Sequence, residues 1–471
     1  MDKLAVVVLA AGLGKRMGKD LPKVILKTRE RPLIQHVLTT ANSLNPERIV
    51  VVVGHKRELV EETVSSGASE GLYPKEKIRY ALQSSQKGTG DAVKAALPEL
   101  EGFVGTVVIL YGDVPITRVE TLRSLIERHH ADKATLSLVV LHSDQFTAYG
   151  RILRDDSGHV SRIVELKDCS PLQVGIRELN PGIYAVDSSF LAPAVSELKN
   201  ENAQKEYYLT DIVQRAAEEG QSISSIITAD AGEVQGVNTP VDLEVVNRIL
   251  RERQVLNLVN NGVIIEDSAS LYLDSEVKIA SGCVVGPQVQ IRGKSSLKTG
   301  VKIEGCALII DSEIEEEATI KFSCRIESSK IGKETQIGPF AHLRAGTILG
   351  EDVKVGNFVE TKQAVLHNGA KASHLSYLGD CEVGKESNIG AGVITCNYDG
   401  VNKHRTKIGE NAFIGSDTCL VAPVSVGDGA LIGAGSVITK DVPKDALGLS
   451  RAPQTIREEW AAKRRESLKK S

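Results

Sequence analysis

The chain has 471 residues, a formal net charge of −4, 41% hydrophobic residues and 25% charged residues. This length suffices for more than one domain with a large core, the charge gives no sign of a nucleic-acid partner, and no apolar run reaches membrane-spanning length. The seven cysteines lack paired or metal-ligand spacing, so we expect free core thiols, no zinc site or disulfide framework, and a reducing cytoplasm.

Residues 1–228 alternate short aliphatic runs with helical patterns. The runs cover residues 3–9, 48–53, 78–82, 106–110 and 134–141, and the helical patterns include residues 33–44 and 90–97. This rhythm is typical of a doubly wound, mostly parallel, Rossmann-like α/β sheet. Ligands of such sheets bind beyond the carboxyl ends of the strands, so the loops after these strands are the expected place for chemistry.

A loop of small residues follows the first strand. It reads Leu9-Ala10-Ala11-Gly12-Leu13-Gly14-Lys15-Arg16-Met17, and Lys23 comes shortly after it. Small residues let backbone N–H groups approach a phosphate, and Arg16 and Lys23 add positive charge where a triphosphate would lie. The loop is neither a Walker A motif, because Arg16 stands where Ser or Thr is required, nor a Rossmann glycine fingerprint. Phosphate binding is favoured over a purely structural turn.

A second candidate site follows the buried run 106–110. It reads Tyr111-Gly112-Asp113-Val114-Pro115. A carboxylate at a strand end can hold Mg²⁺, which binds through one or two protein oxygens plus substrate phosphates. The alternative is an Asp that caps a helix. The glycine-rich loop on the first strand favours the metal.

A helical pattern separates the two halves of the chain. Pro240 opens it, and residues 241–256 place Leu243, Val246, Ile249 and Leu250 on one face with charges opposite. We therefore expect a nucleotide-binding domain over residues 1–228 and a linker with a connecting helix over residues 229–256.

Residues 257–452 carry a hydrophobic repeat of six residues. Neither a helix nor an ordinary half-buried strand has this period, whereas short strands separated by turns do, so we expect a solenoid of hexapeptide repeats. Where the repeat shifts phase we expect inserted loops, which are common places for function. The repeat positions are Leu273, Ile279, Val285, Ile291, Leu297, Ile303, Ile309, Ile314, Ile320, Ile326, Ile331, Ile337, Leu343, Leu349, Val355, Val383, Ile389, Ile408, Ile414, Leu420, Val426, Ile432 and Ile438.

Two further segments interrupt or end the repeat. The polar stretch 397–405 cannot line a solenoid core and must project outward, either as a solvated turn or to reach a ligand or a neighbouring subunit. Residues 453–471 form a tail in which residues 455–470 predict a short charged helix with Trp460 on its apolar side. Because terminal repeats need a cap, we expect this helix to cover the last coil.

Several motifs together resemble those of sugar-1-phosphate nucleotidyltransferases. They are the loop Leu-Ala-Ala-Gly-x-Gly-x-Arg-Met with Leu-Pro-Lys, Gln83 with Gly88-Thr89-Gly90, Tyr111-Gly112-Asp113, Tyr149-Gly150-Arg151, Glu165, Asn180 and Gly236-Val237-Asn238. With the hexapeptide repeats added, the chain resembles, nearly end to end, the bacterial bifunctional N-acetylglucosamine-1-phosphate uridylyltransferase/glucosamine-1-phosphate N-acetyltransferase family. Two positions depart from the family pattern: Lys15 replaces a common Thr, and Ser373 replaces a usual Gly. The resemblance implies a left-handed parallel β-helix for the solenoid.

For the first domain the resemblance implies uridylyl transfer. The phosphate oxygen of N-acetylglucosamine-1-phosphate attacks the α-phosphorus of UTP and pyrophosphate leaves, which requires positioning and charge neutralisation but no protein nucleophile. By analogy Asp113 and Asn238 bind Mg²⁺, and Arg16 and Lys23 are catalytic cations. The implied substrate contacts are Leu9, Ala10, Ala11, Gly12, Lys23, Tyr111, Gly112 and Asn238, with Gln83, Gly88 and Thr89 at uracil and Gly150, Glu165 and Asn180 at the sugar and ribose.

For the solenoid the resemblance implies acetyl transfer from acetyl-CoA to glucosamine-1-phosphate. Attack by the amine needs a base, most often a histidine, and His374 is the candidate, with Glu360 beside it. Arg344, Lys362 and Tyr377 suit a sugar phosphate. The remaining implied contacts are Asn388 near the sugar, Asn397 and Tyr398 near the sugar and coenzyme A, and Ala391, Ser416, Ala434 and Arg451 near coenzyme A.

The resemblance also implies a cytoplasmic homotrimer that joins through its β-helices and supplies UDP-N-acetylglucosamine for peptidoglycan and lipopolysaccharide. Two alternatives remain open from the sequence. One is a nucleotidyltransferase with a regulatory solenoid, as in enzymes that make ADP-glucose, and the other is a non-enzymatic scaffold. The regulatory solenoid is disfavoured because such a domain has no use for a base, His374, beside phosphate-binding residues such as Arg344, Lys362 and Tyr377. The scaffold is disfavoured by the candidate catalytic residues Arg16, Lys23 and Asp113.

Overall fold

The computed structural model describes residues 3–12, 21–28, 31–144, 148–228 and 230–469. The chain divides into two compact units, Met1–Leu250 and Arg251–Ser471, and helix α8 (Pro240–Asn260) crosses the division. No helix within the described ranges is both long and apolar enough to span a membrane.

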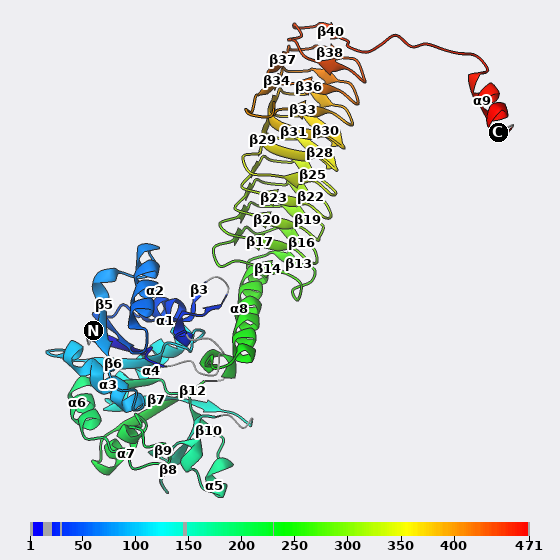
Figure 1. The fold of residues 1–471 in the computed structure, drawn as a ribbon. Helices are drawn as coiled ribbons and strands as arrows, with labels where there is room; N and C mark the ends of the chain where they lie inside the picture. The colour runs from blue at the N-terminus through cyan, green and yellow to red at the C-terminus, as the bar shows by residue number, and fades with distance from the viewer. Residues whose placement is uncertain (1–2, 13–20, 29–30, 145–147, 229, 470–471) are drawn as a thin grey trace. The chain divides into compact units, whose positions relative to one another are not determined.

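The N-terminal unit is built on a ten-stranded sheet with the order β5-β4-β1-β6-β11-β7-β10-β8-β9, and β12 pairs with β7 (Figure 1). The half formed by β5, β4, β1 and β6 is parallel, as the sequence predicts. The other half is mixed, because β11 and β10 run antiparallel to their neighbours. The strands are β1 (Leu4–Leu9), β4 (Arg48–Val53), β5 (Ile78–Leu82), β6 (Thr106–Tyr111), β7 (Leu136–His142), β8 (Gly150–Arg154), β9 (Val160–Val164), β10 (Glu178–Asn180), β11 (Tyr184–Asp187) and β12 (Ile223–Thr228), with a small hairpin of β2 (Lys27–Thr28) and β3 (Arg31–Pro32).

Helices cover both faces of this sheet, which explains why β1 is apolar at every position. Alternate β1 residues enter two different cores: Val7 packs with α3, α6 and α7, and Val8 packs with α1, α2 and α4. Such double burial is characteristic of doubly wound sheets. The helices are α1 (Leu33–Asn42), α2 (Arg57–Ser69), α3 (Thr89–Ala96), α4 (Val119–Ala131), α5 (Pro171–Val174), α6 (Ser188–Ser196) and α7 (Asp211–Glu218).

A buried histidine gives this unit a predicted pH dependence of stability. His129 on α4 is 1% exposed, and its ring nitrogens contact Ser137 Oγ at 2.9 Å and Asp187 Oδ1 at 3.2 Å. Burial lowers the pKa of His129 below its usual value, although Asp187 acts in the opposite direction. The contribution of neutral His129 to the free energy of unfolding is therefore fully present above about pH 6.5, the pKa of an unfolded histidine. This contribution is lost as the pH falls through the lower pKa of the folded state.

We expect calorimetry to show a lower unfolding temperature for the N-terminal unit at about pH 5.5 than at about pH 7.5, with a smaller difference in His129→Gln. Equal differences in the two proteins would contradict this role of His129.

The C-terminal unit is a parallel β-helix in which short strands stack in three rows (Figure 1). The first row is β13 (Ile264–Ile265), β16 (Val284–Val285), β19 (Lys302–Ile303), β22 (Thr319–Ile320), β25 (Gln336–Ile337), β28 (Lys354–Asn357), β30 (Lys371–His374), β32 (Asn388–Ile389), β35 (Phe413–Ile414), β38 (Leu431–Ile432) and β40 (Leu447–Gly448). The second is β14 (Tyr272–Leu273), β17 (Gln290–Arg292), β20 (Leu308–Ile310), β23 (Arg325–Glu327), β26 (His342–Leu343), β29 (Glu360–Leu366), β31 (Tyr377–Val383), β33 (Ile394–Cys396), β36 (Cys419–Val421) and β39 (Val437–Ile438). The third is β15 (Lys278–Ile279), β18 (Ser296–Leu297), β21 (Glu313–Ile314), β24 (Lys330–Ile331), β27 (Ile348–Leu349), β34 (Thr406–Ile408) and β37 (Val424–Val426), with β29 and β31 continuing into it.

The six-residue repeat forms the core of this β-helix. Val285 pairs with Ile303, Ile303 with Ile320 and Ile320 with Ile337, so one aliphatic side chain stacks on the next from coil to coil. The side chains of the repeat are buried in one continuous core, except that Ile279 is only partly buried against it. The predicted solenoid is therefore confirmed.

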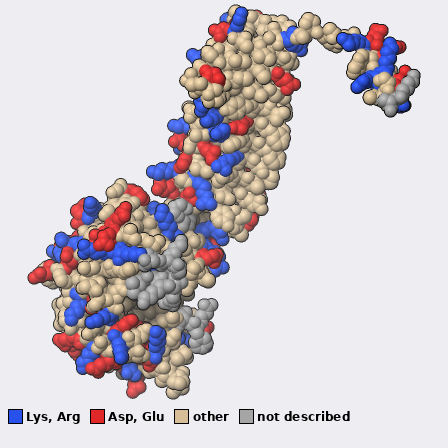
Figure 2. Space-filling view, in the orientation of Figure 1, with Lys and Arg blue, Asp and Glu red and all other residues tan. Residues whose placement is uncertain are grey.

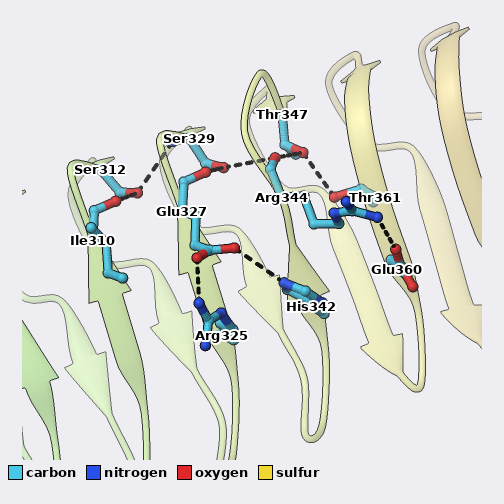
Figure 3. Close-up of polar contacts among 10 residues, drawn as sticks. All are labelled: Ile310, Ser312, Arg325, Glu327, Ser329, His342, Arg344, Thr347, Glu360 and Thr361. Atoms are coloured by element: carbon cyan, nitrogen blue, oxygen red, sulfur yellow. Dashed lines mark hydrogen bonds and ion pairs between the residues drawn. The ribbon is translucent and has the colours of Figure 1, made fainter.

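Buried hydroxyls support the corners of the coils (Figure 3). Ser312 Oγ accepts the backbone N–H of Ser329 at 3.2 Å, and the hydroxyls of Thr347 and Thr361 contact each other at 2.9 Å. Because buried polar groups need partners, small hydroxyl residues at these positions close the turns without leaving unpaired atoms. The corners are thus specified by residue type as well as by the repeat.

Two sequence expectations need correction. The tail forms helix α9 (Trp460–Lys469), but every described residue from 451 to 469 is exposed, so in the single chain this helix covers nothing. Its apolar residues are too few to make a stripe that could pack on a coil. The seven cysteines are all free, but only Cys283, Cys324 and Cys381 are buried, and the other four are partly exposed.

Candidate active sites

The first site lies at the carboxyl ends of β1 and β6. The backbone N–H of Gly112 donates to Leu9 O at 2.9 Å, which fixes the two strand ends against each other. Leu9, Ala10 and Ala11 are buried, and Gly12 is exposed. A Cβ at Gly12 would lie 3.5 Å from Lys23 Cε, so the Lys23 side chain passes directly over the start of the loop. Arg16 lies outside the described residues.

Lys23, Asp113 and Asn238 meet at this edge although they are far apart in sequence. The Lys23 ammonium donates to Asp113 Oδ2 and, at 2.9 Å, to Asn238 Oδ1. The backbone N–H of Val237 donates to Asp113 O at 2.9 Å and holds the two segments together. The two oxygens therefore converge on one cationic group, which is the arrangement that a divalent cation requires.

The donor set at this edge fits Mg²⁺ with substrate phosphates as additional ligands. No group of three or more His, Cys, Asp or Glu residues gathers around a metal position in the described part of the chain. A carboxylate and an amide oxygen alone leave most coordination positions to water and phosphate, as is usual for Mg²⁺ in phosphoryl-transfer sites.

Gln83, Gly88 and Thr89 lie together at the N-terminus of α3. Gln83 is 6% exposed, and its amide donates to Gly88 O at 3.0 Å and Asp91 Oδ2 at 2.8 Å. Gly88 has a φ of +109°, and a Cβ there would lie 2.6 Å from Tyr207 O, so only glycine fits. Its neighbour in this arrangement, Asp91, was missed by the sequence analysis.

Tyr111, Gly150, Glu165 and Asn180 surround the next part of the site. Burial raises the pKa of Tyr111, and the nearby Glu165 carboxylate raises it further. Burial also raises the pKa of Glu165, whose Oε1 accepts from the Thr210 hydroxyl at 3.2 Å. A Cβ at Gly150 would lie 2.8 Å from Ile163, so this glycine lets the two strands approach. The amide of Asn180 donates to the Tyr184 hydroxyl at 2.7 Å.

The second site begins with cations on the β-helix. Arg344 donates to Glu360 Oε1 at 2.8 Å (Figure 3). A side-chain hydrogen bond with Lys403, then the positive charge of Lys403 and that of Arg344, lower the pKa of Lys362. Lys403 belongs to the outward loop 397–405, so that loop places a third cation at the predicted phosphate-binding residues. Glu360 and Asp380 offset part of this positive charge, and a doubly charged anion such as a phosphate would offset the rest.

His374 lies at the end of β30 with its ring exposed. Its Nδ1 is 2.8 Å from Asn357 Oδ1, and Asn357 occupies the matching position one coil earlier. An amide oxygen only accepts, so Nδ1 carries the proton and the lone pair is on Nε2. Asn357 was not predicted from the sequence. The signal that could have found it is its register, because it lies one coil before His374. Tyr377 lies over Gly379, where a Cβ would be 2.5 Å from its hydroxyl.

The residues predicted to contact coenzyme A form a column along one corner of the coils. Gly392 N–H donates to Leu375 O at 2.7 Å, Asp417 N–H to Ala391 O at 2.7 Å, and Gly435 N–H to Ser416 O at 2.8 Å. Arg451 continues the column by donating to Ala434 O at 3.0 Å. The column begins at Leu375, next to His374, and forms an extended surface on which a long ligand could lie.

The other predicted residues lie on neighbouring strands and on the outward loop. Asn388 on β32 pairs in register with Lys371, which begins β30, the strand that ends at His374. Asn397 is 8% exposed and donates to Asp380 Oδ2, whereas Tyr398 is 61% exposed and donates to Gly400 O at 2.6 Å. The two residues therefore sit at the base and on the outside of the loop that carries Lys403.

Comparison with known protein families matches both units. Residues 5–240 match the nucleotidyl transferase family, residues 268–367 the GMPPB C-terminal domain, and residues 405–440 the hexapeptide repeat of succinyl-transferase. The chain is 44% identical to a bifunctional protein GlmU of Pelobacter propionicus, over 98% of each chain. It is 45% identical to one of Ralstonia nicotianae over 97% of each chain, and 43% identical to one of Geobacter sulfurreducens over 99% of this chain and 100% of that one.

A nucleotidyltransferase unit joined to a left-handed β-helix of hexapeptide repeats defines a class of two-site transferases, and this fold class confirms the sequence prediction. Within that class, the chain belongs to the family of bifunctional GlmU proteins, to which it is related along nearly its whole length. It is a bifunctional enzyme with uridylyltransferase and acetyltransferase activities. The scaffold and single-activity alternatives are therefore wrong.

Proposed function

We propose that the N-terminal unit transfers the uridylyl group of UTP to N-acetylglucosamine-1-phosphate. The sugar-phosphate oxygen attacks the α-phosphorus, a new P–O bond forms, and pyrophosphate leaves with the electrons of the broken bond. The observation that carries this half is the convergence of Lys23, Asp113 and Asn238 at the carboxyl ends of β1 and β6. Positioning and charge neutralisation of this kind are the main means of phosphoryl-transfer catalysis.

The surrounding residues divide into three groups in this proposal. The phosphate-binding site is lined by residues 9–12, Tyr111 and Gly112. The side chains of Lys23 and Arg16 offset the negative charge of the phosphates. Gln83, held by Gly88 and Asp91, reads uracil with Thr89 beside it. Gly150, Glu165 and Asn180 hold the sugar and ribose hydroxyls.

Asp113 and Asn238 would hold Mg²⁺ in the working enzyme. When bound, the metal supplies positive charge that neutralises the phosphate oxygens. The Lys23 ammonium, which lies between the two oxygens here, would give up this position to the metal and direct its charge at the phosphates instead.

The C-terminal unit acetylates glucosamine-1-phosphate in the preceding step. The sugar amine attacks the thioester carbonyl of acetyl-CoA, the C–N bond forms, the C–S bond breaks and coenzyme A leaves as the thiol. His374 Nε2 takes the proton of the attacking amine and gives it to the sulfur of the leaving coenzyme A. The cations Arg344, Lys362 and Lys403 support this half, because Arg344 directly follows β26, Lys362 lies on the neighbouring strand β29 of the same row, and positive charge suits a sugar phosphate.

The other acetyl-site residues act as contacts in this proposal. Glu360 orients Arg344 and lies in the base's neighbourhood, Tyr377 and Asn388 face the sugar, and Asn397 and Tyr398 hold the loop against sugar and coenzyme A. Ala391, Ser416, Ala434 and Arg451 form the track for coenzyme A.

We divide the chain in the same proposal into a uridylyltransferase domain over residues 1–228, a linker over 229–256, an acetyltransferase β-helix over 257–452 and a tail over 453–471. The enzyme acts in the cytoplasm as a homotrimer that joins through the β-helix. Phe413, Leu431 and Leu447 support this assembly, because they stack in register on one outer face and are 49%, 46% and 66% exposed. Figure 2 shows a broad uncharged flank on this unit beside a charged edge, and exposed apolar columns are typical of subunit contacts.

The direct test is one incubation of the protein with glucosamine-1-phosphate, acetyl-CoA, UTP and Mg²⁺, followed by mass spectrometry. We expect UDP-N-acetylglucosamine, pyrophosphate and free coenzyme A. UDP-glucosamine as the main product would contradict the proposed order of the two steps.

Asn357 provides a finer test of the acetyl site. Loss of its hydrogen bond to His374 Nδ1 in Asn357→Ala frees the ring to change tautomer, and one such bond is worth about 1 kcal/mol. We expect a fall in kcat of acetyl transfer of about fivefold, with the KM for acetyl-CoA little changed. Asn357→Asp, which keeps an acceptor oxygen facing Nδ1, is expected to retain most of kcat. An unchanged kcat in Asn357→Ala, or an equal loss in Asn357→Ala and Asn357→Asp, would contradict a role in orienting the base.

A further inference from the structure

Glu233 is a buried carboxylate that none of the roles above uses. It lies in the short helix η6 (Ala231–Val234) and is 2% exposed. Its Oε2 accepts the backbone N–H of Arg118 at 3.1 Å and the Thr121 hydroxyl at 2.7 Å, and its Oε1 accepts the Thr228 hydroxyl. A carboxylate is costly to bury unless it is fully hydrogen-bonded, so this arrangement is specific rather than incidental.

These hydrogen bonds connect the two segments that carry the proposed metal ligands. Arg118 is the N-cap residue of α4 and ends the loop that begins with Asp113. Glu233 precedes the segment that ends with Asn238. The carboxylate of Glu233 thus ties the far end of one ligand segment to the far end of the other.

Three more hydrogen bonds hold this arrangement: two join the two segments to each other, and one ties the second segment to Tyr149. Val237 N–H donates to Asp113 O at 2.9 Å next to the ligands themselves. The Thr117 hydroxyl donates to Glu233 O at 3.2 Å, and the Tyr149 hydroxyl donates to Val234 O at 2.7 Å. The two segments are therefore joined at both ends, and neither ligand can move far without breaking a buried contact.

We infer that Glu233 is a positioning residue that sets the separation of Asp113 and Asn238 and thereby the affinity of the uridylyl site for its divalent cation. The inference rests on the proposed metal role of Asp113 and Asn238. Groups that orient metal ligands typically change metal affinity about 10- to 100-fold when they are mutated. A carboxylate that only capped α4 would affect stability and leave cation affinity unchanged.

The test uses Glu233→Gln in the full-length protein. The variant keeps the shape of the side chain but places an NH₂ group against donors that need an acceptor. Electron paramagnetic resonance measures Mn²⁺ bound to the protein in the presence of UTP, and the Mn²⁺ dependence of uridylyl transfer is measured beside it. We expect the Kd for Mn²⁺ to rise about tenfold or more, with most of kcat recovered at saturating Mn²⁺ and acetyl transfer unchanged.

Two further variants make the result interpretable. Glu120→Gln removes a carboxylate from an exposed position in the first turn of α4, the helix whose N-terminus Glu233 contacts, and we expect it to leave Mn²⁺ affinity unchanged. Thr121→Val removes one donor to Glu233 at little change in volume, and we expect a shift in Kd in the same direction but smaller. Thr121→Val also serves if Glu233→Gln does not fold.

A lower unfolding temperature in Glu233→Gln and Thr121→Val with unchanged Kd for Mn²⁺ would overturn the inference. Asp113→Ala in the same assay separates this from a failure of the proposed function. If Asp113→Ala binds Mn²⁺ as the unmodified protein does, the metal assignment itself is wrong. If Asp113→Ala loses Mn²⁺ and Glu233→Gln does not, only the role of Glu233 is wrong.

Discussion

Replacement of His374 by alanine is expected to lower acetyl transfer by about 10²- to 10⁴-fold, the usual contribution of a general base, and to leave uridylyl transfer within about twofold. The imidazole Nε2 is the proposed proton acceptor, and its tautomer is set by Asn357. Alanine leaves no group at this position to take the proton of the amine. Free coenzyme A release and UDP-N-acetylglucosamine formation, measured separately, check the two halves.

The matched control for this variant is His367→Ala. His367 lies on the same β-helix and its Nε2 contacts Glu382 at 3.0 Å, so its loss removes a histidine and an ion-pair partner away from the proposed base. We expect little change in either activity. A comparable loss of acetyl transfer in both variants would show that the effect of His374→Ala is structural.

Asp113→Ala is expected to have the reverse effect, with uridylyl transfer lowered by roughly 10²- to 10³-fold and acetyl transfer kept. The substitution removes one of the two oxygens that converge on the cation position and leaves Lys23 with Asn238 alone. Phosphate charge at the reacting centre is then poorly neutralised. Release of pyrophosphate from UTP and N-acetylglucosamine-1-phosphate is the measurement.

Asp156→Ala serves as the control for Asp113→Ala, because Asp156 is an exposed aspartate of the same unit. It is expected to leave both activities near their original levels. A folded Asp113→Ala protein that loses both activities would mean that the two reactions do not use separate sites.

The fold was largely predictable because two periodic patterns dominate the chain. Residues such as Val285, Ile303 and Ile320 recur at one position of each coil, and the β-helix places them all in one core. The parallel half of the N-terminal sheet followed from apolar strands buried on both faces. The mixed half did not, because β10 and β11 are short and their direction depends on tertiary packing rather than on residue pattern.

The candidate sites were predictable only in part. Residues in recognisable motifs, such as Asp113 and His374, were found from the sequence. Asn357, Lys403 and Glu233 were not, because each acts through a partner that is distant in sequence and is brought close by a coil or a loop. The prediction that the tail helix around Trp460 covers the last coil was wrong. It relied on the general need for a cap, although the tail has no apolar stripe that could pack on a coil.

The most direct test of two independent sites on one chain is to mix the His374→Ala and Asp113→Ala proteins with glucosamine-1-phosphate, acetyl-CoA, UTP and Mg²⁺. Alone, Asp113→Ala should accumulate N-acetylglucosamine-1-phosphate, and His374→Ala should consume almost no substrate. Mixed, the two should form UDP-N-acetylglucosamine, because the acetylated sugar phosphate diffuses from one protein to the other. Failure of the mixture to form it, with both proteins folded and the intermediate present, would contradict the account.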